Sequence, residues 1–184
     1  MDLRQLIVVA VALVVLLGIV WMFMRKQRTI NLQKRFGPEY DRAVREIGPQ
    51  RAESVLLERE KRVQEFFFRE LSAEEREGFL SEWRTVQTRF VDDPQAAVGD
   101  ADLLVDRLMQ ARGYPMSNFE QRAADISVGH PTVVDNYRAA HEIAVRHSQG
   151  QASTEDLRNA IIYYRSLFEE LLQNRPSAHK KEVA

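Results

Sequence analysis

The sequence predicts an all-α protein in which an N-terminal transmembrane helix precedes a compact bundle of about five to seven helices. Three observations support this fold class. An uncharged apolar run extends from Leu6 to Met24. After it, no segment alternates apolar and polar residues as a strand does, and apolar residues recur at the three- and four-residue spacing of amphipathic helices. Gly-Pro pairs and capping residues divide this helical pattern into segments.

Length and composition indicate one folded domain behind the apolar run. The chain has 184 residues, of which 29% are charged, and this balance is typical of a globular protein. It contains no cysteine, which excludes disulfides, iron–sulfur clusters, thiolate zinc sites and a cysteine nucleophile.

The apolar run has the length of a membrane anchor. Its 19 residues approach the ~20 needed to cross a hydrocarbon core of about 30 Å. In lipid the backbone must satisfy its own hydrogen bonds, so the segment is expected to be helical. Trp21 suits the headgroup boundary. A cleaved signal peptide is the alternative, but the run is too long, and the sequence from Trp21 to Lys26 has no small-x-small cleavage site.

Basic residues next to the run predict its orientation. Arg4 alone precedes it, whereas Arg25, Lys26 and Arg28 follow it at once, so the positive-inside rule places the C-terminal domain in the cytoplasm. From residue 25 to residue 69 the chain carries 12 basic and 7 acidic residues, and from 70 to 136 it carries 6 basic and 13 acidic. The basic stretch favours contact with anionic lipid headgroups. The residues expected in this contact are Arg25, Lys26, Arg28, Lys34 and Arg35.

Nucleic acid is disfavoured as a partner, because no module of interleaved aromatic and basic residues is present.

Gly-Pro pairs bound the first helices. Gly37-Pro38 and Gly48-Pro49 each end one helix and place proline at the first position of the next. The resulting helices are expected to end near residues 35, 47 and 68.

Capping signals bound the later helices, which are expected over residues 72–92, 94–112, 118–125, 130–147 and 153–173. These signals are Ser72 with Glu75, Asp93 before Pro94, Gly113, and Ser153 or Thr154. We therefore predict four parts: an anchor and juxtamembrane helix (1–35), a charged helical stem (36–70), a helical bundle (71–173) and a polar tail (174–184).

Residue types that can take part in catalysis or binding are most concentrated just after the middle of the chain. The possible interaction or ligand site comprises Tyr114, Asp125, His130, Tyr137, Arg138 and His141. Serine, histidine and aspartate occur together here, which suggests a hydrolase, but no Gly-x-Ser-x-Gly elbow is present. Ser127 and His130 are better explained as turn and capping residues before a helix that begins with proline. No catalytic residue is therefore assigned.

No metal or cofactor site is predicted. His141 shares an apolar face with Tyr137 and is expected to be a hydrogen-bonded core residue, and no second ligand stands at helical spacing from it. The aspartates between residues 92 and 106 do not match a calcium loop. We interpret them as helix-start carboxylates and part of a solvated face.

Two aromatic features remain. Tyr114 stands between Gly113 and Pro115, where it can pack on the core or contact a partner, and packing is favoured. Three consecutive phenylalanines, residues 66–68, cannot all point inward from one helix, so one of them must lie at the core edge or in a contact with the bilayer or another chain.

Four motifs stand out along the chain: Arg-Phe-Gly-Pro-Glu-Tyr-Asp-Arg-Ala-Val44, Phe-Val-Asp-Asp-Pro94, Arg-Gly-Tyr-Pro115 and Ser-Thr-Glu-Asp-Leu-Arg158. Together they resemble a family of uncharacterised bacterial, single-pass, membrane-anchored helical proteins. The resemblance covers nearly the whole chain. It implies a bacterial origin, and hence the inner membrane, but no activity, cofactor or site.

These observations leave three functional hypotheses. The first is a membrane-tethered domain that binds a protein partner or forms a homo-oligomer, without catalysis. The second is a helical domain that binds a small apolar or lipid ligand, since aromatic residues are frequent on its apolar faces. The third is a hydrolase or metal enzyme centred on Asp125, His130 and His141.

Overall fold

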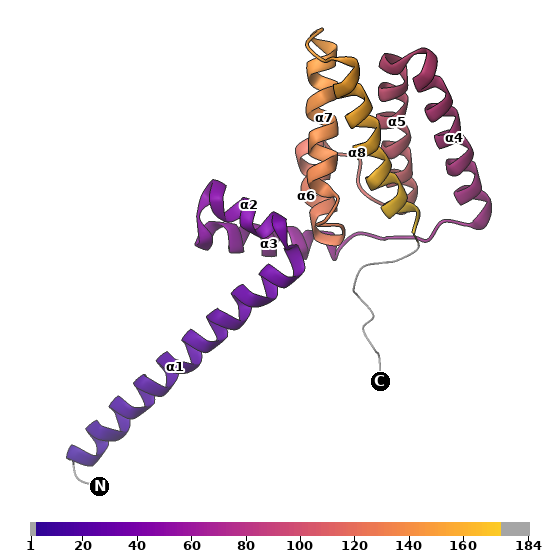
Figure 1. The fold of residues 1–184 in the computed structure, drawn as a ribbon. Helices are drawn as coiled ribbons and strands as arrows, with labels where there is room; N and C mark the ends of the chain where they lie inside the picture. Colours follow the sequence, from indigo (N-terminus) through magenta and orange to yellow (C-terminus); the bar gives the residue numbers. More distant parts are fainter. Residues whose placement is uncertain (1–2, 174–184) are drawn as a thin grey trace. The chain divides into compact units, whose positions relative to one another are not determined.

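A computed structural model describes residues 3–173, with no description of the side chains of residues 3–12 and 14. The predicted polar tail, 174–184, lies outside the described residues. Within them the chain forms eight α-helices and no strand, which confirms the all-α prediction (Figure 1). The helices are α1 (Leu3–Phe36), α2 (Pro38–Ile47), α3 (Pro49–Val63), α4 (Ala73–Asp92), α5 (Pro94–Arg112), α6 (Phe119–Gly129), α7 (Val134–Ser148) and α8 (Thr154–Leu172).

The chain divides into two compact units, one ending at Glu53 and the other beginning at Ser54. The division into four parts stays a prediction. In the first unit, Glu53 joins α1 and α2 to the start of α3. The Thr29 and Tyr40 hydroxyls donate to its Oε1 over 2.6 and 3.3 Å. The turns between these helices use Gly37 and Gly48 at φ values of 48° and 79°, a region that glycine enters without steric cost.

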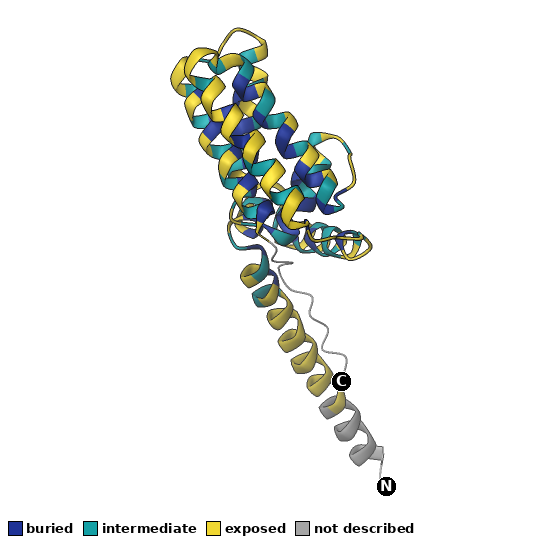
Figure 2. Cartoon of the chain, turned by 90° about the vertical axis from the view of Figure 1, so that its right-hand side faces the viewer, coloured by how far each residue is buried: buried dark blue, intermediate teal, exposed yellow. Residues whose placement is uncertain are grey.

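The described large apolar side chains in the first part of α1 are exposed, whereas Leu32 and Phe36 near its end are buried. From Leu13 to Met24 the described ones are 46 to 68% exposed, and Figure 2 shows this part of the helix as exposed. In the part of the chain that the structure describes, no helix has the length and apolarity needed to span a membrane. The predicted anchor begins at Leu6, among the residues whose side chains are not described.

The second unit is a helical bundle. Helix α5 packs between α4 and α8, and α8 packs between α5 and α7, while α6 packs on α7 (Figure 1). Buried residues of α4 to α8 form one hydrophobic core, and Figure 2 colours buried residues dark blue. Trp83 of α4 stacks on Phe168 of α8 with ring centroids 4.7 Å apart. The apolar stripe of α8, from Leu157 to Leu171, is buried.

Local capping signals give the predicted helix starts. Ser72 accepts from the Glu75 backbone N–H over 3.1 Å, and the Glu75 carboxylate accepts from the Ser72 N–H over 2.9 Å, so the capping box is confirmed. Asp93 caps α5, and Ser153, not Thr154, caps α8. Gly113 ends α5 in the left-handed conformation at φ 94°.

The predicted extension of the third helix to Phe68 is wrong, because α3 ends at Val63. The residues after Val63 lie against the C-terminal end of α5. The Arg69 N–H donates to the Arg112 carbonyl over 3.2 Å. A Cβ on Gly113 would stand only 2.3 Å from the Phe67 carbonyl oxygen. This close backbone contact holds residues 67–69 in a non-helical path.

The boundary between α6 and α7 also differs from the prediction. Helix α6 continues to Gly129 and α7 begins at Val134. Ser127 therefore lies inside α6 and is not a turn residue. His130 does cap a helix, but at the end of α6, where its N–H donates to the Ile126 carbonyl over 2.8 Å. Pro131 explains this end, because proline disfavours a helical conformation at the residue before it.

Candidate functional site

Three of the predicted site residues, Tyr114, Asp125 and His130, lie within one polar cluster with Arg112 and Glu170. Burial raises the pKa of the Tyr114 phenol, the Arg112 charge opposes this shift, and the Asp125 and Glu170 carboxylates add to it. The Tyr114 ring meets that of Phe68 edge-on, with centroids 4.8 Å apart. Tyr114 thus packs on the core, as the sequence favoured.

Asp125 is 2% exposed and connects α6 to α3. Its Oδ1 accepts from the Arg62 guanidinium, over 3.0 Å from Nε and at shorter range from Nη2. Gln121 Nε2 donates to the same oxygen over 3.0 Å. A buried carboxylate held by a guanidinium and an amide is a structural anchor, because removing the guanidinium leaves the carboxylate charge without compensation.

His130 pairs with a carboxylate from another helix. Its Nδ1 lies 3.0 Å from Glu170 Oε1 of α8, and the residue is 6% exposed. Burial lowers the pKa of His130, whereas Glu170 raises it. The Ser127 hydroxyl donates to the Ala124 carbonyl over 2.6 Å and accepts from Arg59 over 3.3 Å. Its proton is therefore not directed at His130, as a nucleophilic serine would require.

The other three predicted residues have different surroundings. His141 stacks on Phe119, with centroids 3.6 Å apart and an angle of 9° between the rings. It lies at the edge of the core, only partly buried. Arg138 bonds Asp135 over 3.3 Å. Tyr137 is fully buried and accepts from Arg122 Nε over 3.2 Å.

Tyr137 belongs to a second polar cluster, formed with Asp102, Asp106, Arg122 and Tyr164. Arg122 Nη2 lies 3.3 Å from Asp106 Oδ2, and the Tyr137 and Tyr164 rings meet edge-on at 6.4 Å. Burial raises the pKa of Tyr137 to about 12. It also raises the pKa of Asp106, with Arg122 opposing and Asp102 adding to the shift.

The interpretation of Asp102 and Asp106 as part of a solvated face is incomplete, because both carboxylates turn partly into the bundle. A signal was present in the spacing. Asp102 stands four residues after Val98 and three before Val105, and both valines are buried. A carboxylate on that stripe must meet polar partners from another helix.

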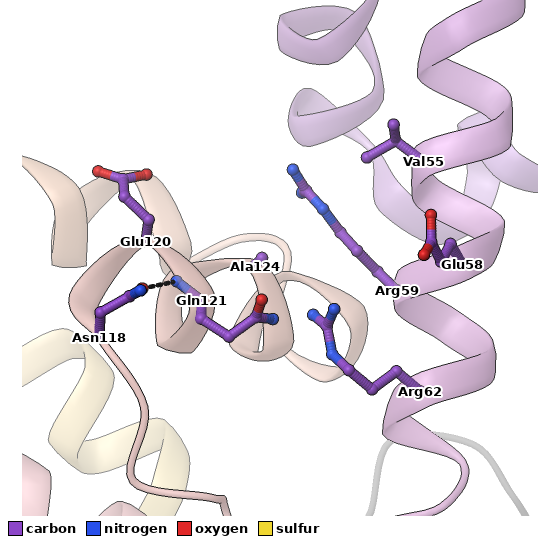
Figure 3. A pocket seen from close by; sticks show the side chains of 8 residues that line it. All are labelled: Val55, Glu58, Arg59, Arg62, Asn118, Glu120, Gln121 and Ala124. Carbon is purple, nitrogen blue, oxygen red and sulfur yellow. Dashed lines mark hydrogen bonds between the residues drawn. The ribbon is translucent and has the colours of Figure 1, made fainter.

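Two grooves open on the second unit. One, of about 400 Å³, lies between α3 and α6. Figure 3 shows Arg59 and Arg62 extending from α3 toward α6, with Gln121 facing them. Glu58 and Glu120 also line it, so its charge is mixed. The other, of about 550 Å³, lies between α4 and α5 and has Val86, Leu104 and Met116 in its lining.

The predicted headgroup contacts lie along the second half of α1. Arg25, Lys26, Arg28 and Lys34 are exposed, and Arg35 is half-buried. The Arg25 guanidinium carbon stands 5.4 Å from the centre of the Trp21 ring. This cation–π arrangement connects Arg25, the first basic residue after the apolar run, to Trp21 near the end of that run.

Among the described residues, no group of three or more histidine, aspartate or glutamate side chains is arranged to hold a metal ion. Comparison of the chain with protein-family models, curated proteins and solved structures gives no match.

Proposed function

We propose that this protein is a membrane-tethered helical domain that binds another protein at the cytoplasmic face of a bacterial inner membrane. The observation that carries the proposal is the exposure of the described apolar side chains between Leu13 and Met24. A long run of exposed large apolar side chains is unfavourable in water, so this part of the helix is expected to lie in an apolar environment. A bilayer is the environment that suits an uncharged run of 19 residues, Leu6 to Met24.

The charge next to this run supports the tether and its orientation. Arg25, Lys26 and Arg28 are exposed immediately after the apolar side chains, where each basic residue gains about 1 kcal/mol from an anionic surface. Tryptophan and arginine at the same end of the helix suit the interface between hydrocarbon and headgroups.

Phe67 supports the protein-binding part of the proposal. Its side chain is 94% exposed, although its backbone is held by the contact of its carbonyl with Gly113 and by the Arg69 hydrogen bond to Arg112. A large aromatic side chain on a fixed backbone loses little conformational entropy when a partner covers it. Such residues dominate binding energy at protein interfaces.

Site-specific photocrosslinking in living cells tests the proposal. The full-length chain would carry a photoreactive phenylalanine at position 67, and a matched control would carry it at Val91, which is 81% exposed on α4. We expect a covalent adduct in the membrane fraction from position 67 and none from position 91. An adduct of twice the chain's mass identifies a homo-oligomer, and any other mass identifies a different protein. Absence of an adduct at position 67, or equal adducts at both positions, would overturn the proposal.

A second candidate function is the binding of a small apolar ligand. The groove of about 550 Å³ between α4 and α5 favours it, because this volume lies within the range of small-molecule sites. The hydrolase alternative has no comparable support, since the Ser127 hydroxyl and the His130 ring have separate partners.

A further inference from the structure

The segment between α3 and α4 presents two phenylalanines to solvent at the end of the bundle where α5 ends (Figure 1). Phe67 is 94% exposed and Phe68 is 41% exposed. The Phe68 ring packs edge-on against the buried ring of Tyr114, with centroids 4.8 Å apart. Phe68 therefore lies at the edge of the core, whereas almost all of the Phe67 side chain is accessible to a partner.

The groove between α4 and α5 has apolar side chains both inside it and at its rim. Val86 and Leu104 are buried in its lining, whereas Leu103 and Met116 are 64% and 46% exposed. Large apolar side chains that are exposed around an apolar groove are typical of an interaction surface. Its volume of about 550 Å³ is in the range that holds small-molecule ligands, so a phenylalanine side chain fits within it.

Phe67 and this groove are neighbours on the surface of the second unit. The Phe67 carbonyl lies against Gly113, and Met116, which lines the groove, follows Gly113 by three residues. Three residues span at most about 11 Å. Phe67 does not fill the groove of its own chain, because its side chain is 94% exposed. When a protruding group and an acceptor surface lie side by side, a two-fold rotation can place each copy's group on the other copy's acceptor, and the assembly closes as a dimer.

The charges of the two surfaces are complementary. Residues 61–69, which include Phe67, carry three basic side chains and one acidic side chain. Four charged residues line the groove, and three of them are acidic: Glu82, Asp100, Asp106 and Arg107. Opposite net charges on facing surfaces steer the encounter of two molecules and help to fix their register. A second copy of the chain supplies both surfaces.

The proposed membrane tether favours such a dimer even if its interface is small. A phenylalanine buries about 150 to 250 Å², and the contact forms twice in a two-fold dimer. A dimer that is free in solution generally buries about 1,200 to 2,000 Å². Anchoring in one membrane raises the effective concentration of one copy beside another, so a smaller interface is sufficient. It also gives all copies the same orientation, as a two-fold axis along the membrane normal requires.

We propose that Phe67 of each copy inserts into the groove between α4 and α5 of a second copy, so that two tethered chains form a reciprocal two-fold dimer. The inference rests on the proposed function and identifies the protein partner as the same chain. The second copy then occupies the groove that the second candidate function assigns to a small ligand.

Photocrosslinking between two differently tagged copies in living cells tests this inference. One full-length copy carries a photoreactive phenylalanine at position 67, which keeps an aromatic ring there, and the other copy has the natural sequence. We expect an adduct that carries both tags. Mass spectrometry of the crosslinked peptides should place the new bond among the groove residues between Asp100 and Met116.

Variants of the copy without the photoreactive residue assign the contact to the groove. Leu103→Arg places a charge at the rim and should lower the yield of the adduct with both tags about tenfold or more, because contacts with a central aromatic residue dominate the binding energy of an interface. Met116→Arg should act in the same direction and tests the groove even if Leu103→Arg fails to fold. Val145→Arg, at an exposed residue of α7, is the matched control and should leave the yield unchanged.

Three results would contradict the inference. If the adduct with both tags is bonded outside the groove, or if its yield is unchanged by both rim variants, the chain forms a homo-oligomer by another surface and the proposed function survives. If position 67 crosslinks only to a different protein, the inference fails and the proposed function again survives. If position 67 gives no adduct, both fail.

Discussion

The hydroxyl of Tyr164 shows how a single buried atom can reduce stability. The ring is fully buried. Its Oη lies beside the Asp102 carboxylate, which adds to the effect of burial in raising its pKa, but makes no hydrogen bond of good geometry among the described residues. A hydroxyl that leaves water without finding a partner costs about 1 to 3 kcal/mol. The ring contributes apolar burial that phenylalanine would keep.

We therefore expect Tyr164→Phe to raise the free energy of unfolding by about 1 kcal/mol. Urea denaturation followed by circular dichroism measures this change. Tyr137→Phe is the matched control, because its hydroxyl accepts from Arg122 over 3.2 Å, and that variant should lose stability. A loss in both variants would show that the Tyr164 hydroxyl has a partner in solution.

His130 should make stability depend on pH. Burial holds its pKa in the folded state below the ordinary value of 6.5, even though Glu170 opposes the shift. The unfolded chain then binds a proton at a higher pH than the folded chain does. Stability is consequently expected to fall as the pH drops below about 6.5.

Melting temperatures measured between about pH 7.5 and about pH 5.5 test this dependence. His130→Gln should show a flatter profile than the wild type, because glutamine does not titrate in this range. The other histidines are the same in both proteins, so the difference isolates His130. Parallel profiles would contradict the assignment.

At the scale of elements, Gly113 joins the end of α5 to the segment that follows α3. Its φ of 94° is strained for any residue with a side chain, and an added Cβ would stand 2.3 Å from the Phe67 carbonyl oxygen. Gly150 has a similar φ of 71° but nothing within 4 Å of such a Cβ. Comparing substitutions at Gly113 and Gly150 therefore separates the cost of backbone strain from the cost of steric overlap.

Gly113→Ala should therefore destabilise the protein by more than about 2 kcal/mol, and Gly150→Ala by only about 1 kcal/mol. Thermal or urea denaturation of both variants measures the difference. Equal losses would show that the segment around Phe67 moves away from Gly113 without cost. In that case Phe67 would not be held on a fixed backbone.

The helix boundaries that could be predicted are those set by neighbouring residues. Ser72, Asp93, Gly113 and Ser153 each act within one helical turn, so their effects are visible in the sequence. The end of α3 was missed because it depends on contact with α5, about fifty residues away in the chain.

Of the candidate site residues, too, some could be predicted from the sequence and others could not. Tyr114, Asp125 and His130 were predicted from their residue types, and they share one cluster. The position of Asp102 against Tyr164 was missed, because only the packing of α8 on α5 turns that carboxylate into a buried acceptor. Sequence spacing can show that a carboxylate lies on a buried helix face, but it cannot identify the residues of other helices that cover it.

At the scale of the whole molecule, the proposed membrane tether has the largest consequence, because it would determine where in the cell the bundle acts. Leu16 and Leu17 stand near the middle of the apolar run and are 58% and 64% exposed. An arginine at the centre of a membrane helix costs about 2.5 to 3.5 kcal/mol by insertion scales, so two should cost about 5 kcal/mol or more. The double variant Leu16→Arg with Leu17→Arg should move the full-length protein from carbonate-washed membranes to the supernatant. Val145→Arg, at an exposed apolar residue of α7, is the control and should remain with the membranes. If the double variant also remains, the contact with the membrane does not depend on the apolar run, and the tether must be abandoned.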